Sequence, residues 1–103
     1  MLNDLNHVLL EGTIIGDVFP SEKADKKALN FYVRCERETD GKIESWNHPV
    51  VVWNELAERY SKTLVRDMYV RIRGHLQTIT VPNNEGKMLT FSKVCADKIE
   101  YDV

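Results

Sequence analysis

Apolar and polar residues alternate over much of the chain, and this period of two predicts strands with one buried face. In the first predicted strand the inward positions are Val8, Leu10, Gly12 and Ile14. In the second predicted strand the inward positions are Leu29, Phe31, Val33 and Cys35. Between the two, Gly16, Asp17 and Pro20 lead into a polar run that ends at Lys27. We therefore expect an exposed, turn-forming connection over residues 16–27.

A third strand is predicted from about Ile43 to Trp53, after a turn over residues 39–42, because this run is rich in β-branched residues. Proline cannot donate to a sheet, so we expect the strand at Pro49 to lie at an edge or to contain a bulge. Asn54 is expected to cap a short helix. Four residues at helical spacing predict its buried side: Leu56, Ala57, Tyr60 and Leu64.

Alternation returns after the helix and predicts two more strands. The fourth strand has these inward positions: Val70, Ile72, Gly74 and Leu76. Its outward positions are Tyr69, Arg71, Arg73, His75 and Gln77. A turn over residues 82–86 precedes a last strand from Met88 to Tyr101. Five strands with one short helix between strands 3 and 4 predict an all-β OB-fold, a Greek-key barrel, as a single domain over residues 1–103.

Composition agrees with one soluble domain, since 103 residues that are 43% hydrophobic can bury a single core. The chain has 14 Lys and Arg against 16 Asp and Glu, a net charge of −2. This balance excludes a polybasic nucleic-acid binder, but it allows basic residues to gather on one face. Charged residues interrupt the first twenty positions, and no apolar run approaches the roughly 20 residues of a membrane span. We expect a cytoplasmic protein without membrane contact.

Residues that could ligate metals or carry out catalysis are scattered along the chain. Cys35 and Cys95 are far apart, as are His7, His48 and His75. We therefore expect two buried thiols in strands, with no metal site and no cofactor. The sequence contains no nucleotide-binding glycine loop and no defensible catalytic triad or carboxylate pair, so an enzyme is not predicted.

Several blocks of sequence point to a known family when they are taken together. They are Asn6, Val8, Leu10, Gly12, Ile14 and Gly16-Asp17; Ala28, Asn30 and Phe31; His48, Val50 to Trp53 and Leu56-Ala57-Glu58; Leu64, Val70, Ile72, Gly74, Leu76 and Thr78; and Val94, Ala96-Asp97, Ile99 and Tyr101. From about residue 6 to residue 101 the chain resembles bacterial single-stranded DNA-binding proteins. The resemblance implies an OB-fold that binds single-stranded DNA without catalysis in replication, repair or recombination.

The sequence departs from that family at several positions. The family usually continues into a flexible region with an acidic tip, whereas this sequence stops at Val103, so no such tail is expected. Trp53 matches one of the positions where the family stacks bases, but Val81 occupies another, and the one between strands two and three is Glu36 or Arg37.

A further family tryptophan corresponds to Asn47, next to Trp46, so a bulge near Pro49 would be needed to align it. The stretch from Trp46 to Val52 also resembles the primosomal replication-restart protein PriB, a dimeric relative with the same fold. The alternative function is therefore a protein-interaction module among replication or primosome proteins. The net charge favours this alternative, whereas the outward positions of Tyr32, Arg34 and Trp53 favour DNA binding.

A binder of single strands needs rings that stack on bases and cations that neutralise phosphates. The residues expected to bind nucleic acid are Trp53, Trp46, Tyr32, Arg34, Lys87 and Lys93. Trp53 could instead cap the core and Tyr32 could be a cross-strand packing residue. Strict alternation from Trp53 places Trp46 on the opposite face.

On the outward side of the first strand, Leu5 and Leu9 are apolar side chains that would be exposed in a single chain. Pairing of first strands across a two-fold axis would bury them. By resemblance, His48, Arg71 and Arg73 also lie where subunits of the family meet. Alternatively, His48 is an ordinary strand histidine, and the two arginines contact DNA. The expected interface residues are Leu5, His7, Leu9, His48, Arg71 and Arg73. We expect a homotetramer, or otherwise a homodimer.

Overall fold

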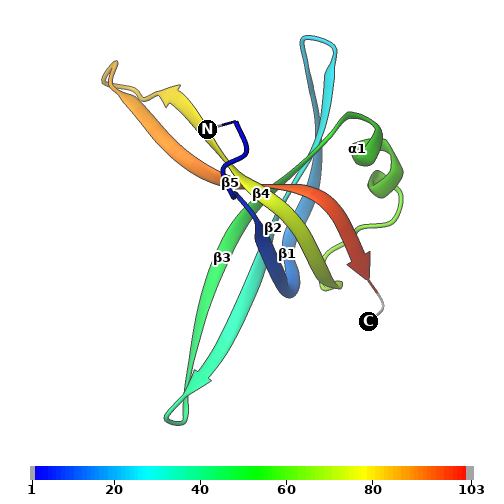
Figure 1. The fold of residues 1–103 in the computed structure, drawn as a ribbon, viewed down its shortest axis with the longest axis vertical. Helices are drawn as coiled ribbons and strands as arrows, with labels where there is room; N and C mark the ends of the chain where they lie inside the picture. The colour runs from blue at the N-terminus through cyan, green and yellow to red at the C-terminus, as the bar shows by residue number, and fades with distance from the viewer. Residues whose placement is uncertain (1, 102–103) are drawn as a thin grey trace.

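The computed structural model describes residues 2–101, apart from the side chain of Lys23, and has five strands and one helix in the predicted order. The elements are β1 (Val8–Lys23), β2 (Lys26–Thr39), β3 (Lys42–Trp53), α1 (Asn54–Ser61), β4 (Tyr69–Pro82) and β5 (Met88–Tyr101). The strands close into a barrel in the order β1-β2-β3-β5-β4 (Figure 1). Among the strand contacts of residues 2–101, only the one between β3 and β5 is parallel. This topology confirms the predicted OB-fold.

The inward rows of the five strands meet in one core, as the alternation predicted. Its largest fully buried side chains are Phe31, Ile14, Leu29, Ile72, Val33, Val50, Val52 and Val70. Helix α1 and the residues after it add Ala57, Tyr60 and Leu64 to the core. The Tyr60 hydroxyl donates to the carbonyl of Ile99 at 3.1 Å and lies 3.3 Å from the backbone N–H of Ile99. These bonds tie the helix to β5.

Three hairpins extend away from the barrel, formed by β1–β2, β2–β3 and β4–β5 (Figure 1). The β2–β3 ladder runs without a register shift from Ala28 to Thr39, whereas β3 pairs with β5 only at Val50 and Val51. Within residues 2–101, Pro49 therefore has a strand partner on one side only. This confirms the edge position expected for Pro49, and no bulge accompanies it.

The predicted connection over residues 16–27 is wrong, because β1 continues to Lys23 and the turn contains only Ala24 and Asp25. The register with β2 shifts between Ile15 and Phe19, and Gly16 in this interval has φ +70°. Glycine adopts this left-handed conformation without a steric penalty. The glycine that seemed to end the strand therefore lies within an irregularity of the strand.

The expected cap at Asn54 is also corrected. Trp53 occupies the N-cap position, and no side chain there bonds to the helix. The side-chain oxygen of Asn54 instead accepts from the backbone N–H of Lys27 at 3.4 Å, so it links α1 to β2. None of the described residues belongs to a helix that could span a membrane.

Leu76 was predicted to lie in the core, but 48% of it is exposed. The pairing between β1 and β4 ends at Val8 and Gly74, so β4 has left the closed part of the barrel where Leu76 begins the arm. Asn6 holds this end, because its amide donates to the Leu76 carbonyl and accepts from the Leu76 N–H, each at 2.9 Å.

Candidate functional site

Strands β2 and β3 place three of the expected binding residues on the side of the sheet that faces away from the core. In the register, Ala28 lies opposite Trp53, and Tyr32 and Arg34 lie two and three steps further along the same row. Opposed residues of an antiparallel pair project to the same side, as do residues two apart along one strand. Tyr32, which is 50% exposed, therefore shares an outer face with Trp53 and Arg34.

Strands β4 and β5 extend this outer face. Lys93 lies opposite Gln77, and Phe91 lies opposite Ile79 in the same outward row. The indole N–H of Trp53 donates to the side-chain oxygen of Gln77 at 3.4 Å. Because β5 lies between β3 and β4 in the barrel, this bond spans the sheet. We define the candidate binding face as Tyr32, Arg34, Trp53, Gln77, Phe91 and Lys93.

Trp53 is partly buried at the centre of this face. Its ring packs against Ala28, Val51 and Cys95, a small apolar cluster outside the barrel core. The ring is thus packed on one side by this outer cluster and not by the barrel core. The packing fixes the orientation of the ring, and the remaining surface is accessible.

Phe91 is the aromatic residue of this face that sequence reasoning missed, and it is 51% exposed. A signal was available, because Phe91 is two residues before Lys93 in the last predicted strand and therefore projects to the same side. It also lies opposite Ile79 in the β4–β5 arm, near the place of Val81. The arm therefore carries a ring although Val81 does not supply one.

Trp46 and Lys87 lie apart from the other expected binding residues. Trp46 is opposite Cys35 in an unshifted register, so it projects from the face of the β2–β3 arm opposite Trp53, and it is 46% exposed. Lys87 is exposed in the β4–β5 turn, where its backbone N–H donates to the Asn83 side chain at 2.9 Å. The register thus confirms the alternation argument for Trp46.

The cations of the face differ in their surroundings. Arg34 Nε lies 3.2 Å from Glu36 Oε1 without hydrogen-bond geometry, and it is otherwise an unsatisfied buried atom. Among the described residues, the guanidinium has no second ion-pair partner. Lys93 is half-buried beside Gln77. Both cations can therefore accept a further anionic group.

The residues expected at a subunit interface lie mainly on another part of the surface. Leu5 and Leu9 are exposed, as is His7, whereas His48 is half-buried on β3. The two arginines of β4 have partners within the chain: Arg71 Nε lies 3.0 Å from Glu11 Oε1, and Arg73 Nε lies 4.0 Å from Glu100 Oε1.

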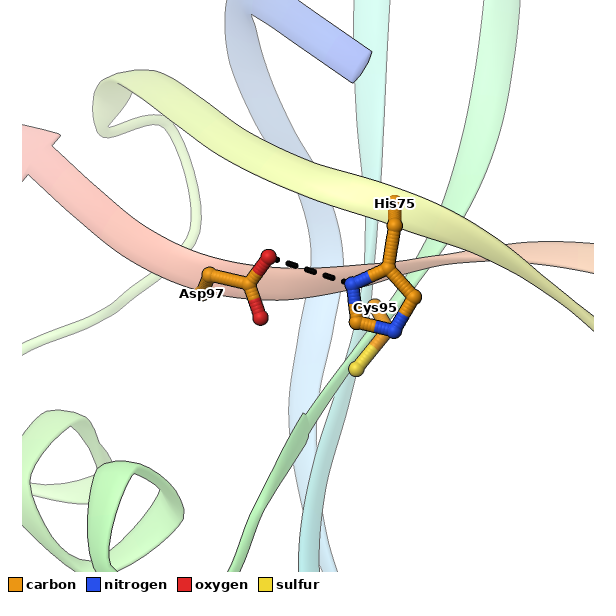
Figure 2. Close-up of side chains that lie close together, drawn as sticks. All are labelled: His75, Cys95 and Asp97. Atoms are coloured by element: carbon orange, nitrogen blue, oxygen red, sulfur yellow. Dashed lines mark hydrogen bonds and ion pairs between the residues drawn. The ribbon is translucent and has the colours of Figure 1, made fainter. Parts of the chain in front are cut away.

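Close to Trp53, the fold also brings together His75, Cys95 and Asp97, which the sequence analysis treated as scattered. Figure 2 shows their side chains pointing toward one another from β4 and β5. His75 Nδ1 lies 3.1 Å from Asp97 Oδ2, and His75 Nε2 lies 3.3 Å from the Gln77 amide nitrogen. Both cysteines are free thiols; Cys95 is buried as predicted, whereas the prediction was wrong for Cys35, which is only half-buried. Burial together with the charge of Asp97 raises the pKa of Cys95.

A cavity of about 400 Å³ lies between the β1–β2 hairpin and α1, and none of His75, Cys95 and Asp97 lines it. Lys27 and Glu58 form an ion pair at its edge. Their hydrogen bond and mutual attraction lower the pKa of Glu58 and raise the pKa of Lys27. This opposed pair carries no net charge, so it gives the cavity no preference for an anionic ligand.

Comparison with known proteins finds a family match and a relative. A family model described as the single-strand binding protein family matches residues 5–102. The chain is also 27% identical to the single-stranded DNA-binding protein 2 of Chlorobaculum tepidum over 105 aligned positions. That alignment covers 95% of this chain and 71% of the relative.

Proposed function

Since the chain belongs to the single-strand binding protein family, we propose that it binds single-stranded DNA with little sequence preference through the candidate binding face. The observation that carries the proposal is the fixed ring of Trp53, held by Gln77 between two hairpins that also present Tyr32 and Phe91. The function is non-enzymatic, and it serves DNA replication, repair or recombination in the cytoplasm.

The chemistry of the face suits an unpaired strand. Each base has a π-face that can stack on a ring of Trp53, Tyr32 or Phe91, and such stacking does not distinguish the bases. Arg34 and Lys93 supply positive charge for the phosphates. Little sequence preference follows, because neither stacking nor phosphate neutralisation reads base edges.

Lys87 and Trp46 take secondary places in the proposal. Lys87 extends the cationic track past the end of the β4–β5 arm. Trp46 contacts a strand only if the DNA passes around the β2–β3 arm, because its ring projects from the face opposite Trp53.

The proposed assembly is a homotetramer, or otherwise a homodimer, in which the exposed leucines Leu5 and Leu9 are covered by a second copy. His7, His48, Arg71 and Arg73 complete the proposed subunit contacts. Because Arg71 and Arg73 already have carboxylate partners in their own chain, they would join a shared ion-pair network between subunits. Light scattering of the intact chain measures the mass of the assembly.

A titration with fluorescein-labelled oligo-dT, followed by anisotropy at several salt concentrations, tests the function. For three phosphate-contacting cations per chain, the slope of log K against log salt is expected near −2, from about −0.7 for each contact on a single strand. A duplex of the same length is the control and should bind more weakly. No binding of oligo-dT at low salt would contradict the proposal and favour a protein-interaction module of the primosomal kind.

A further inference from the structure

The ladder between β4 and β5 contains one irregularity, and it lies at the cluster of His75, Cys95 and Asp97. Gly74 lies opposite Ala96, but Arg73 lies opposite Lys98, so Asp97 is an extra residue in β5. An extra residue of this kind bends a strand and redirects its side chains. Here it keeps Asp97 on the outer side, where Figure 2 shows it facing His75.

Close approach of the two strands at this point depends on a glycine. A Cβ added at Gly74 would lie only 2.1 Å from the backbone oxygen of Cys95. A side chain at position 74 would therefore push β4 away from β5 beside the cluster. The position of Cys95 next to His75, its partner in the ladder, thus follows from the backbone and not from flexible side chains.

The three side chains offer different ligand atoms at short range. One nitrogen of His75, the sulfur of Cys95 and a carboxylate oxygen of Asp97 all lie within 4.8 Å of one another. Thiolate, imidazole and carboxylate are the three ligand types of zinc sites, at roughly 2.0 to 2.3 Å from the metal. A thiolate disfavours Mg²⁺ and Ca²⁺, which take oxygen ligands.

The surroundings also fit a cation. Cys95 is buried and Asp97 is exposed, so the cluster has a closed side in the protein and an open side toward solvent. His75 Nδ1 is the ring nitrogen nearest to Asp97, which leaves Nε2 beside the Gln77 amide. The Gln77 amide nitrogen is a donor, so it is not the acceptor that usually orients a metal-binding histidine, and a metal at His75 would take the place of one of these two hydrogen bonds.

We propose that His75, Cys95 and Asp97 form a three-ligand site for Zn²⁺ on the outer surface of β4 and β5. Binding displaces the proton of the Cys95 thiol to solvent, because the thiolate is the ligand form. The coordination positions left over face solvent and hold water. Zn²⁺ binding at this cluster does not require DNA, so it can be tested separately from the proposed function.

The test uses the full chain without a histidine tag and Co²⁺ as a spectroscopic probe, followed by competition with Zn²⁺. We expect one Co²⁺ per chain, a near-ultraviolet charge-transfer band from thiolate to Co²⁺, and displacement of Co²⁺ by Zn²⁺. Loss of an outer partner alone typically costs at least about tenfold in metal affinity, so His75→Gln and Asp97→Asn, which each remove a ligand, should weaken binding by more than that.

Cys95→Ser should abolish the charge-transfer band, and Cys35→Ser, which changes the other free thiol, is the matched control and should keep it. Because Cys95 is buried and its variant could unfold, circular dichroism checks the fold of every variant. The variants of half-buried His75 and exposed Asp97 test the metal site without changing a buried residue. The absence of a band in the folded wild-type chain would overturn the proposal. Equal Co²⁺ affinity in folded His75→Gln and wild type would also overturn it.

Discussion

Trp53 and Gln77 are joined by a hydrogen bond of 3.4 Å that reaches across β5, from the end of β3 to the middle of β4. The bond satisfies the indole N–H while one side of the ring packs on Ala28, Val51 and Cys95. A ring held in this way loses little further conformational freedom when a base stacks on it. The barrel topology, which brings Gln77 near Trp53, therefore holds the ring in the orientation that the proposed binding of DNA requires.

Replacing Trp53 with alanine should weaken binding to oligo-dT by about 1 to 3 kcal/mol, the usual contribution of one stacked base. Trp53→Phe is the matched control, since it keeps a ring and should retain most of the affinity. Anisotropy of labelled oligo-dT measures both variants. Wild-type affinity in a folded Trp53→Ala variant would assign this ring to packing alone.

Phe91→Ala should also weaken oligo-dT binding by about 1 kcal/mol or more, because the β4–β5 arm would lose its stacking ring. The control is Tyr69→Ala, which removes an aromatic side chain of similar exposure at the start of β4, far along the strand from Ile79, the partner of Phe91. The same titration is expected to leave the Tyr69 variant close to wild type. Equal losses in the two variants would show that Phe91 has no special place in binding.

Much of the fold could be predicted because the inward rows of β1, β2 and β4 alternate where these strands surround the core, and because β3 is rich in β-branched residues. The end of β1 could not be predicted, since its polar residues lie on a hairpin beyond the barrel and no buried row marks them as a strand. Gly16 was interpreted as a turn for the same reason. Its positive φ is a feature of both turns and strand irregularities.

The candidate site was predictable only in part. Tyr32, Arg34 and Trp53 follow from alternation within one hairpin. The grouping of His75, Cys95 and Asp97 depends instead on the register between β4 and β5 and on one extra residue in β5. Hydrophobic patterning does not fix these details, because they concern the outward side of the sheet.

Tyr60→Phe tests the connection between the helix and the barrel. The variant keeps the packed ring but removes the hydroxyl that bonds to both backbone polar groups of Ile99. Leaving these buried groups unpaired should lower the free energy of unfolding by about 1 to 3 kcal/mol. Urea denaturation measures the change, and an unaltered midpoint would show that water replaces the hydroxyl.

Glu58→Gln tests the ion pair with Lys27 through its pH dependence. The pKa of Glu58 is lowered from 4.5, so the contribution of its charge to stability is complete above that value and is lost as pH falls through the lowered pKa. The pKa of Lys27 is raised from 10.5, so the contribution is also lost as pH rises through that raised pKa. We expect a small decrease in Tm at pH 7 and low salt.

This difference between Glu58→Gln and wild type should disappear in strong acid and shrink in high salt, because both side chains are exposed and screened. Thermal unfolding at pH 7 and pH 2 measures it. A Tm difference of the same size at both values of pH would mean that the charge of Glu58 is not responsible.

Titration of the ¹⁵N-labelled chain with oligo-dT, followed by ¹H–¹⁵N correlation spectroscopy, locates the binding surface, because the indole N–H of Trp53 gives its own signal. We expect this signal to shift, together with the backbone signals of Gln77, Phe91 and Lys93. Signals from Glu22, Glu58 and Ser61, which line the cavity beside α1, should stay in place. Saturable binding that shifts these three signals and leaves the Trp53 indole unchanged would rule out the proposed binding face.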